Sequence, residues 1–400
     1  MNHKIEIKPC FIMTKDQEIG KTILRRIFMN GSVTRPEIVR ITGCRAATVL
    51  YTIDLLKKQG IICEPERTGK KTGRKAPALS FTPGCRCFAG IDFQESRTLA
   101  VFTDMTGKIL FQTETQAGDR KTLAGCRQEI RETLCRLKQL AGPWWEKLGG
   151  IGFADPGLVD IPRGFSIRAV NVPGWVEAAT GEWLTREFGV VSGVWPECMV
   201  KTFMECQIRH FPADQSLFHL SLGSGIGGGF IKNGECFTGD TNQAMEIGHI
   251  VIDPNGPLCR CGNRGCLEAV AGETEIIRRV QEALNNGVET ALQMQSFTLE
   301  RFAQYARTDK AARIIAVDVC EKIGKALSVA VTLLNPSLIV LSGSLTAMGD
   351  LLTDSIRNIL KLNCFPGAVR HLRLEISKAP PEAAAAGATQ MMRGKYLGLL

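Results

Sequence analysis

One imidazole and three thiols lie close enough along the chain to bind a metal ion together. They follow the spacing H-x9-C-x-C-x4-C and are His249, Cys259, Cys261 and Cys266. Zinc in proteins is bound by four such ligands in a tetrahedron, and four protein ligands leave no open position for catalysis. A cysteine cluster without a metal is the alternative. The spacing therefore predicts a structural Zn²⁺ site, around which Gly262 and Gly265 let the chain turn tightly.

A glycine-rich segment at 222–235, LGSGIGGGFIKNGE, is the second pattern with a chemical meaning. Backbone amides in such a loop can bind a phosphate group. Tight hairpins between strands also require glycine, so both interpretations stay open for this segment taken by itself.

The positive charge of the chain is concentrated in its first fifth. The whole sequence of 400 residues has a net charge of +9. Residues 1–86 contain 17 Lys and Arg against 7 Asp and Glu, whereas the remainder contains 32 basic and 33 acidic residues. A local excess of this kind is expected of a segment that contacts a nucleic-acid backbone, with a solvated basic surface as the alternative.

Three short helices are expected in this basic segment. Residues 16–30 place apolar side chains on one helical face, and a capping box at Thr34 and Glu37 predicts the start of a second helix that ends at Gly43. Residues 45–60 predict a third helix. Its inward-facing residues are expected to be Val49, Ile53 and Leu56. Two short helices joined by a glycine-containing turn form a helix-turn-helix, and an ordinary helical bundle is the alternative.

The third helix is the one expected to enter the major groove of DNA. The exposed residues near the start of a recognition helix contact bases and phosphates. The candidates for this contact are Arg45, Ala47, Thr48, Tyr51 and Thr52.

Two predicted strands, 61–64 and 78–81, follow the third helix. Between them lies the tip RTGKKTGRK, with five basic residues and two glycines, and a hairpin with such a tip is a wing. Arg74 in the tip could enter a narrow A·T-rich minor groove, where the potential is most negative. A flexible basic linker is the alternative. We therefore predict a winged helix-turn-helix domain over residues 1–86 and a larger domain over residues 87–400.

The larger domain is expected to be α/β, because signals for strands and helices alternate along it. Residues 88–110, FAGIDFQESRTLAVFTDMTGKIL, predict three short strands. With the segment 246–272, EIGHIVIDPNGPLCRCGNRGCLEAVAG, this body resembles the ROK family of repressors and sugar kinases. The resemblance extends over nearly the whole chain, because many ROK regulators also begin with a winged helix. It implies a two-lobed fold of the actin and hexokinase type, which is ribonuclease H-like.

The resemblance also implies a sugar site. The family's E-x-G-H motif and the glutamate after its last cysteine correspond to Glu246, His249 and Glu268, and Asn171 in NVPGW matches a further sugar contact. Carboxylates and an amide suit a polyol, because they can pair with adjacent hydroxyl groups. His249 can bind both metal and sugar only if each ring nitrogen takes one of them. Surface charges without a ligand are the alternative for the glutamates.

Two departures from the family kinases argue against phosphoryl transfer. Their Asp-x-Gly-Gly-Thr loop is replaced here by Asp92 followed by Phe-Gln-Glu-Ser, which brings the charge of Glu95 toward a polyphosphate. Their catalytic aspartate is replaced by Glu197, which remains a candidate sugar ligand. Its side chain is one methylene longer, and a displacement near 1 Å can cost ~100-fold in rate. Segment 333–345 resembles the family's N-P-x-x-I-V-L-G-G, with Ser344 at the second glycine.

These observations predict a transcriptional regulator, most simply a repressor of carbohydrate-use genes, and not an enzyme. A sugar or sugar derivative between the lobes would shift the population toward or away from operator-binding arrangements. A double-stranded DNA operator would be bound by a homodimer or homotetramer, an assembly that the family implies. The alternatives are a sugar kinase with an appended DNA-binding domain and a regulator controlled by a partner protein. No apolar run reaches ~20 residues and no signal peptide is apparent, so we expect a cytoplasmic protein.

Overall fold

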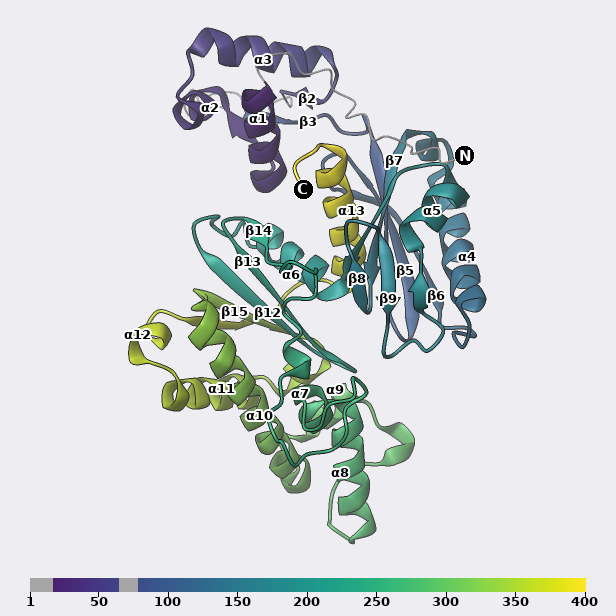
Figure 1. Ribbon diagram of the computed structural model, residues 1–400, viewed down its shortest axis with the longest axis vertical. Helices are drawn as coiled ribbons and strands as arrows, with labels where there is room; N and C mark the ends of the chain where they lie inside the picture. The colour runs from purple at the N-terminus through teal and green to yellow at the C-terminus, as the bar shows by residue number, and fades with distance from the viewer. Residues whose placement is uncertain (1–16, 65–77) are drawn as a thin grey trace. The chain divides into compact units, whose positions relative to one another are not determined.

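Three short helices form the first part of the computed structural model, which describes residues 17–64 and 78–400. They are α1 (Gln17–Asn30), α2 (Arg35–Thr42) and α3 (Ala46–Lys58) (Figure 1). Helix α2 begins as predicted, because Thr34 Oγ1 accepts a hydrogen bond from the Glu37 amide, and it ends at Gly43, whose φ is 62°. The predicted order of helix, turn and helix is therefore confirmed.

A small antiparallel sheet packs with these helices. Its strands are β1 (Val33–Thr34), β2 (Ile62–Cys63) and β3 (Ala78–Phe81), in the order β1-β3-β2. The sequence predicted β2 and β3 but not β1, because two residues are too few to show an alternating pattern. The inward face of α3 is as expected, since Val49, Ile53 and Leu56 are all buried.

The first sheet of the body has five strands in the order β11-β7-β4-β5-β6. The strands are β4 (Cys87–Phe93), β5 (Arg97–Asp104), β6 (Ile109–Gln116), β7 (Leu148–Asp155) and β11 (Ser192–Pro196). The three predicted strands form an antiparallel meander, and β7 and β11 continue the sheet in parallel. Helices α4 (Leu123–Ala141) and α13 (Ala383–Tyr396) lie on opposite faces of this sheet (Figure 1).

Helix α13 approaches the sheet unusually closely. A Cβ atom at Gly90 would overlap the carbonyl oxygen of Ala385, and one at Gly152 would overlap that of Ala388. Successive strand residues point to opposite faces, so these glycines receive α13 while their neighbours Ala89 and Ile91 fill the core on the other face. The sequence Ala-Ala-Ala-Ala-Gly-Ala-Thr of α13 supplies the matching small side chains.

Shorter elements complete this part of the chain. Strands β8 (Leu158–Asp160), β9 (Phe165–Arg168) and β10 (Val176–Ala178) form an antiparallel sheet in the order β10-β9-β8. Helix α5 (Thr180–Phe188) precedes β11, and helix α6 (Glu197–Ile208) follows it directly.

The second sheet of the body also has five strands, in the order β14-β13-β12-β15-β16. They are β12 (Ser216–Leu222), β13 (Ile226–Lys232), β14 (Glu235–Cys236), β15 (Leu338–Ser342) and β16 (Arg373–Ile376). The helices that accompany them are α7 (Leu267–Ala271), α8 (Glu273–Asn285), α9 (Leu299–Tyr305), α10 (Lys310–Leu334), α11 (Asp350–Asn363) and α12 (Pro366–Val369). One continuous apolar core joins the sheet to α10 and α11. Two mixed sheets with flanking helices confirm the predicted α/β body.

Two compact units emerge from the packing. Unit 1 comprises Met1–Val200 with Pro380–Leu400, and unit 2 comprises Lys201–Ala379. The chain crosses between them twice, once inside α6 and once just before α13. This division groups the N-terminal helices with the first sheet, so the predicted domain boundary at residue 86 stays a prediction. None of the helices in the described part of the chain combines the length and apolar composition that a membrane crossing requires.

Candidate functional site

The exposed face of α3 carries most of the residues predicted to contact DNA. Arg45 precedes the helix and is exposed, as are Ala47 and Tyr51, and Thr48 is half-buried. Tyr51 exposes 60% of its surface, which is unusual for an aromatic residue without a partner surface. Arg74 lies outside the described residues.

The expectation that Thr52 lies on this exposed face is wrong. Thr52 is only 4% exposed, and its hydroxyl donates a hydrogen bond of 3.0 Å to the Thr48 carbonyl. Thr52 precedes Ile53 on the helix and turns toward the same core, because a hydroxyl bonded to its own helix can be buried at little cost.

The predicted metal ligands come together in unit 2. The side-chain ligand atoms of His249, Cys259, Cys261 and Cys266 all lie within 4.8 Å of one another. Cys259 Sγ is 3.7 Å from His249 Nδ1, and the sulfur atoms of Cys261 and Cys266 are 3.6 Å apart. A tetrahedral zinc ion with Zn–S bonds of about 2.3 Å separates two sulfur atoms by about 3.8 Å. The cluster is therefore compatible with a zinc site.

Two short turns bring the four ligands together. His249 ends the 3-10 helix η2 (Ile247–His249), and Cys266 immediately precedes α7. Isolated bridges pair Val251 with Cys266 and Leu258 with Arg264, which closes the loop on itself. Gly265 has a φ of 65°, and a Cβ atom there would overlap the Asp253 carbonyl group. The close turn expected at this glycine is confirmed.

The thiols of the cluster have unequal electrostatic surroundings. The backbone amide of Asn263 lowers the pKa of the exposed Cys261, whereas burial raises the pKa of Cys259 and raises that of Cys266 to about 12. Three thiolates placed this close together would repel one another strongly, and a divalent cation is the group that would offset the repulsion.

Three of the predicted sugar ligands lie near one another in unit 2. Glu246 precedes η2, and Glu268 lies in the first turn of α7. Desolvation by surrounding protein atoms raises the pKa of Glu246, although the residue as a whole is exposed. His249 lowers this pKa, and the Glu268 carboxylate raises it. Because Nδ1 of His249 faces the thiols, the opposite ring nitrogen Nε2 is the one directed away from the metal cluster.

Glu268 also connects this group to the glycine-rich segment. Its Oε2 atom accepts a hydrogen bond of 3.0 Å from the Ile226 amide, at the point where β13 leaves the loop. The loop itself is a turn between β12 and β13, as predicted. A ligand that moves Glu268 would therefore act on the glycine-rich loop.

The two remaining predicted sugar ligands belong to unit 1. Asn171 is half-buried in the turn between β9 and β10, and Glu197 is half-buried at the start of α6, directly after β11. Glu197 thus lies where a strand passes directly into a helix.

Asp155 is a residue of this region that the sequence did not single out. It ends β7 and pairs in register with Pro196, which places it beside Glu197. Its carboxylate accepts hydrogen bonds from Ser166 Oγ, from Trp175 Nε1 at 2.8 Å and from the Gly157 amide at 2.9 Å. Burial, with a smaller contribution from the Glu197 charge, raises the pKa of Asp155 to about 6 against the opposing effect of these donors. An isolated Asp before Pro-Gly carries no sequence signal of such burial.

A buried ion pair fixes the loop that follows β4. Arg120 and Glu129 are joined by a hydrogen bond of 3.0 Å from Nε to Oε2, and both side chains are almost fully buried. The Arg120 guanidinium also donates to the Gln94 carbonyl and lies 4.3 Å from the centre of the Phe93 ring. In place of a flexible glycine loop, this position has a turn held by an arginine.

A second carboxylate lies near the glycine-rich loop in unit 2. Gly343 packs against the backbone of Leu222, and the next residue, Ser344, donates a hydrogen bond from its hydroxyl to Glu300. This hydrogen bond lowers the pKa of Glu300, which keeps the carboxylate charged. Negative charge is therefore held one hydrogen bond from Ser344, the residue that follows Gly343.

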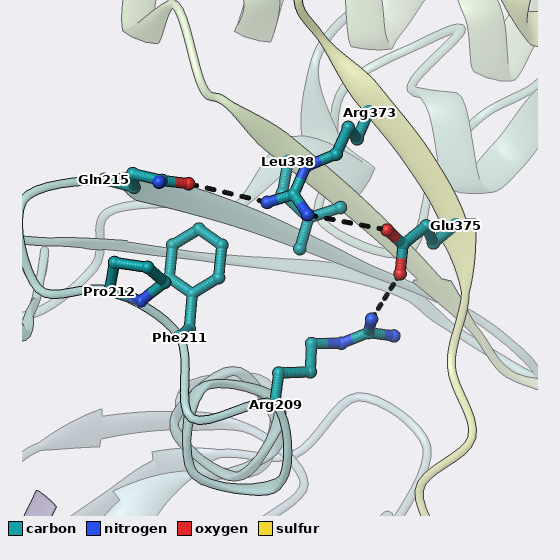
Figure 2. A pocket seen from close by; sticks show the side chains of 7 residues that line it. All are labelled: Arg209, Phe211, Pro212, Gln215, Leu338, Arg373 and Glu375. Carbon is teal, nitrogen blue, oxygen red and sulfur yellow. Dashed lines mark hydrogen bonds and ion pairs between the residues drawn. The ribbon is translucent and has the colours of Figure 1, made fainter. Parts of the chain in front are cut away.

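An open cavity of about 470 Å³ lies elsewhere in unit 2 (Figure 2). Its lining residues are Arg209, Phe211, Pro212, Gln215, Leu338, Arg373 and Glu375. Figure 2 shows Glu375 between the two arginines, and it pairs with both of them. Gln215 immediately precedes β12, and Leu338 is the first residue of β15. The glycine-rich loop follows the opposite end of β12, and β15 runs parallel to that strand. This cavity is thus separate from the candidate sugar residues.

Comparison with known proteins matches this chain to one family. A model of the ROK family matches residues 88–395. The xylose repressor of Caldicellulosiruptor bescii is 24% identical, with 92% of this chain and 94% of that repressor covered. The glucokinase of Thermotoga maritima is 26% identical over 62% of this chain and 80% of the kinase. A solved structure of a ROK family transcriptional regulator, described as a homologue of the Escherichia coli MLC protein, has a TM-score of 0.81 and 21% identity, and covers 96% of both chains.

Proposed function

Because this chain belongs to the ROK family, we propose that it is a DNA-binding repressor of sugar-use genes, controlled by a sugar or sugar derivative. One observation carries the proposal: a helix-turn-helix with an exposed, partly basic recognition face precedes the family body. The extent of the matches supports it, since the repressor and the regulator cover over nine-tenths of this chain and the glucokinase covers 62%.

The recognition surface in this proposal consists of Arg45, Ala47, Thr48 and Tyr51, and Arg74, outside the described residues, is a further candidate contact from its basic sequence context. The net charge of +10 over residues 1–86 supplies the attraction to the phosphate backbone. Thr52 is left out of the surface because it is buried.

Phosphoryl transfer is not part of the proposal. Nucleotide phosphates need close backbone approach, and the turn after β4 is instead held by Arg120 through the Gln94 carbonyl. Glu300 adds a negative charge next to Ser344, which follows the glycine that packs against Leu222. Glu197 replaces the catalytic aspartate of the family kinases, whose side chain is shorter. These three features all oppose the binding or transfer of a phosphate.

The effector in this proposal is a sugar bound by Glu246, His249 and Glu268 of unit 2. Asn171 and Glu197 of unit 1 remain candidate sugar ligands, because they match the family pattern. A Zn²⁺ ion bound by His249, Cys259, Cys261 and Cys266 would have a structural role, fixing the imidazole so that Nε2 can face a hydroxyl group. We expect the protein to act in the cytoplasm as a homodimer or homotetramer, which would present paired recognition helices to a pseudo-palindromic operator.

Selection of bound sequences from random double-stranded DNA tests the proposal. We expect one operator-like motif, bound with a strong dependence on salt concentration. Arg45→Ala should weaken binding by about tenfold or more, and if Arg45 contacts phosphate it should reduce the salt slope by about 1. Arg136→Ala, which removes an exposed arginine on α4, is the matched control and should leave binding unchanged. No enrichment of any sequence would reject the proposal.

An ATP-coupled assay on a panel of hexoses tests the alternative of a kinase. The expected result is no turnover above background. Measurable phosphorylation of any hexose that disappears in Glu197→Gln would replace the proposed function with that of a sugar kinase carrying a DNA-binding domain.

A further inference from the structure

Helix α13 runs from the border between the units to the N-terminal helices. Unit 2 ends at Ala379, and α13 begins four residues later. Its 14 residues span about 20 Å at a rise of about 1.5 Å each. Along this length it packs against β4 and β7, with the close glycine contacts described above. A rigid element thus starts at a crossing between the units and ends elsewhere in unit 1.

The last turn of α13 contacts the helix-turn-helix region through Arg393. This side chain is only 4% exposed. Its guanidinium carbon lies 4.8 Å from the centre of the Phe28 ring in α1 and 5.3 Å from that of Phe81 in β3. The adjacent Gly394 allows this approach, since a Cβ atom there would lie 3.1 Å from the Phe28 ring. Residues of three elements therefore meet around one arginine.

The charge of Arg393 is poorly compensated for a buried group. One guanidinium nitrogen donates a hydrogen bond of 2.9 Å to the Met105 carbonyl, while Nε has no hydrogen-bond partner within the described ranges. Burial lowers the pKa of Arg393 to about 9, and Asp104 is the acidic group that opposes this shift. Ring faces attract a cation less strongly than water does, so an arginine at this position makes the contact weaker than an apolar side chain of similar volume would, although it still fills the space that an alanine would leave empty.

Hydrogen bonds connect the last turn of α13, and the segment just before the helix, to neighbouring parts of the chain. Lys395 Nζ donates a hydrogen bond of 3.0 Å to the carbonyl of Ser192, the first residue of the strand that leads to Glu197. Before the helix, the Pro381 carbonyl accepts a hydrogen bond of 3.3 Å from Arg97. Within unit 2, Ser377 donates a hydrogen bond to Glu205 of α6, so the two segments that cross between the units are joined there.

We propose that α13 transmits the effector signal to the DNA-binding region, and that Arg393 is the positioning residue at which this region docks reversibly on the body. In the docked state the guanidinium lies between Phe28 and Phe81. In the released state it is hydrated, which offsets the loss of the ring contacts. Docking holds the recognition helices of a dimer at a fixed separation, so release weakens operator binding. The predicted effect on operator binding rests on the proposed function, whereas the docking itself does not.

Hydrogen exchange measured by mass spectrometry on the full chain tests the docking without DNA. In Arg393→Ala, amides of α1 and β3 should exchange about tenfold faster, while those of β4 and β7 stay within about twofold. Arg393→Lys keeps the charge but loses the planar stacking, so an intermediate increase is expected. Arg163→Ala is the matched control, because Arg163 lies over the Phe165 ring on an exposed part of unit 1. Unchanged exchange in α1 and β3 would overturn the inference, as would an equal rise in β4 and β7 in both Arg393 variants.

Two further measurements test the transmission. At least one of D-xylose, D-glucose and N-acetylglucosamine should accelerate exchange in α1 and β3 of the wild type and should cause no further change in Arg393→Ala. No response to any of the three sugars would overturn the relay. With the selected operator, Arg393→Ala should bind about tenfold more weakly and Arg163→Ala equally well. If the wild-type protein bound no DNA, the proposed function would be rejected and the docking result would stand. If Arg393→Ala bound the operator normally and its α1 and β3 amides exchanged at the wild-type rate, only this inference would be rejected.

Discussion

His249 has two chemical environments on one ring. Nδ1 faces the sulfur atom of Cys259 at 3.7 Å, and the ring affects the electrostatics of Glu246, which precedes it by three residues. A metal bound at Nδ1 would fix both the tautomer and the orientation of the imidazole. In the proposed site the metal therefore does more than close a loop, because it orients a hydrogen-bonding group toward the effector.

The metal cluster yields a prediction for Cys261. Cys261→Ser should reduce the zinc content of the purified protein from about one ion per chain to less than half, because only three strong ligands remain. Zinc is measured by elemental analysis after dialysis against a weak chelator. Cys135→Ser, which removes another exposed thiol, is the control and should keep its zinc. Equal zinc in both variants would contradict the assignment of Cys261 as a ligand.

Asp155 yields a prediction about pH. Its pKa in the folded protein is raised from 3.8 to about 6, so its contribution to stability is fully present below about pH 4 and is lost as the pH rises through 6. The two-unit shift corresponds to about 3 kcal/mol. Asp155→Asn lacks this titration, so its stability relative to the wild type should improve by up to about that amount between pH 4 and pH 7.

Urea unfolding followed by tryptophan fluorescence measures this difference, and Trp175 contributes to the signal beside the Asp155 carboxylate, to which its indole Nε1 donates. Titrations of groups that do not interact with Asp155 cancel between the two proteins. A difference in unfolding free energy that does not vary with pH would show that Asp155 titrates in the folded state as it does in the unfolded chain.

Individual residues show what could and what could not be predicted from the sequence. The clustering of His249 with the three cysteines was predictable because their types and spacing are rare and the loop that joins them is short. Thr52 was misplaced because a hydroxyl residue next to an inward-facing Ile53 can satisfy itself on its own helix, which a helical pattern does not reveal. Asp155 was missed because its burial depends on Ser166, Trp175 and Pro196, three partners distant in sequence.

At the scale of elements, the contact between α13 and its sheet depends on glycine. Gly152→Ala should lower the free energy of unfolding by about 3 kcal/mol, because the new methyl group would overlap the carbonyl of Ala388 and force the helix away. Thermal unfolding measures the change. Gly367→Ala is the control, since a Cβ atom there meets nothing within 4 Å. Similar stability in the two variants would mean that α13 can shift without cost.

The elements that were predicted individually each carry a local signal. The capping box at Thr34 and the glycine at 43 delimit α2, and apolar runs with intervening turns predicted β4, β5 and β6. The two-residue strand β1 was not predictable, since only its pairing with β3 defines it. The packing of α13 against β4 was equally invisible, because its alanines and the glycines of the strand become complementary only once the chain has folded.

At the scale of the whole molecule, the proposed effector residues are divided between two units that the chain joins twice. Glu246, His249 and Glu268 belong to unit 2, while Asn171 and Glu197 belong to unit 1. Helix α6, which contains one crossing, begins with Glu197, and the other crossing leads into α13. A ligand shifts a protein toward the conformation that it binds more tightly, so these two segments are the covalent connections through which binding in one unit would act on the other.

Thermodynamic linkage gives the last prediction. A sugar that weakens operator binding by a given factor must itself be bound more weakly by the operator complex, by the same factor, because the coupling free energy is shared. If the factor is about tenfold, the coupling is about 1.4 kcal/mol in both directions. Titration calorimetry of the active sugar against the free protein and against the protein saturated with operator measures one side, and operator affinity with and without the sugar measures the other. Glu246→Ala should abolish both shifts while leaving operator affinity without sugar intact. Unequal shifts would show that the sugar acts on DNA binding by a route outside this equilibrium, such as a change of oligomeric state.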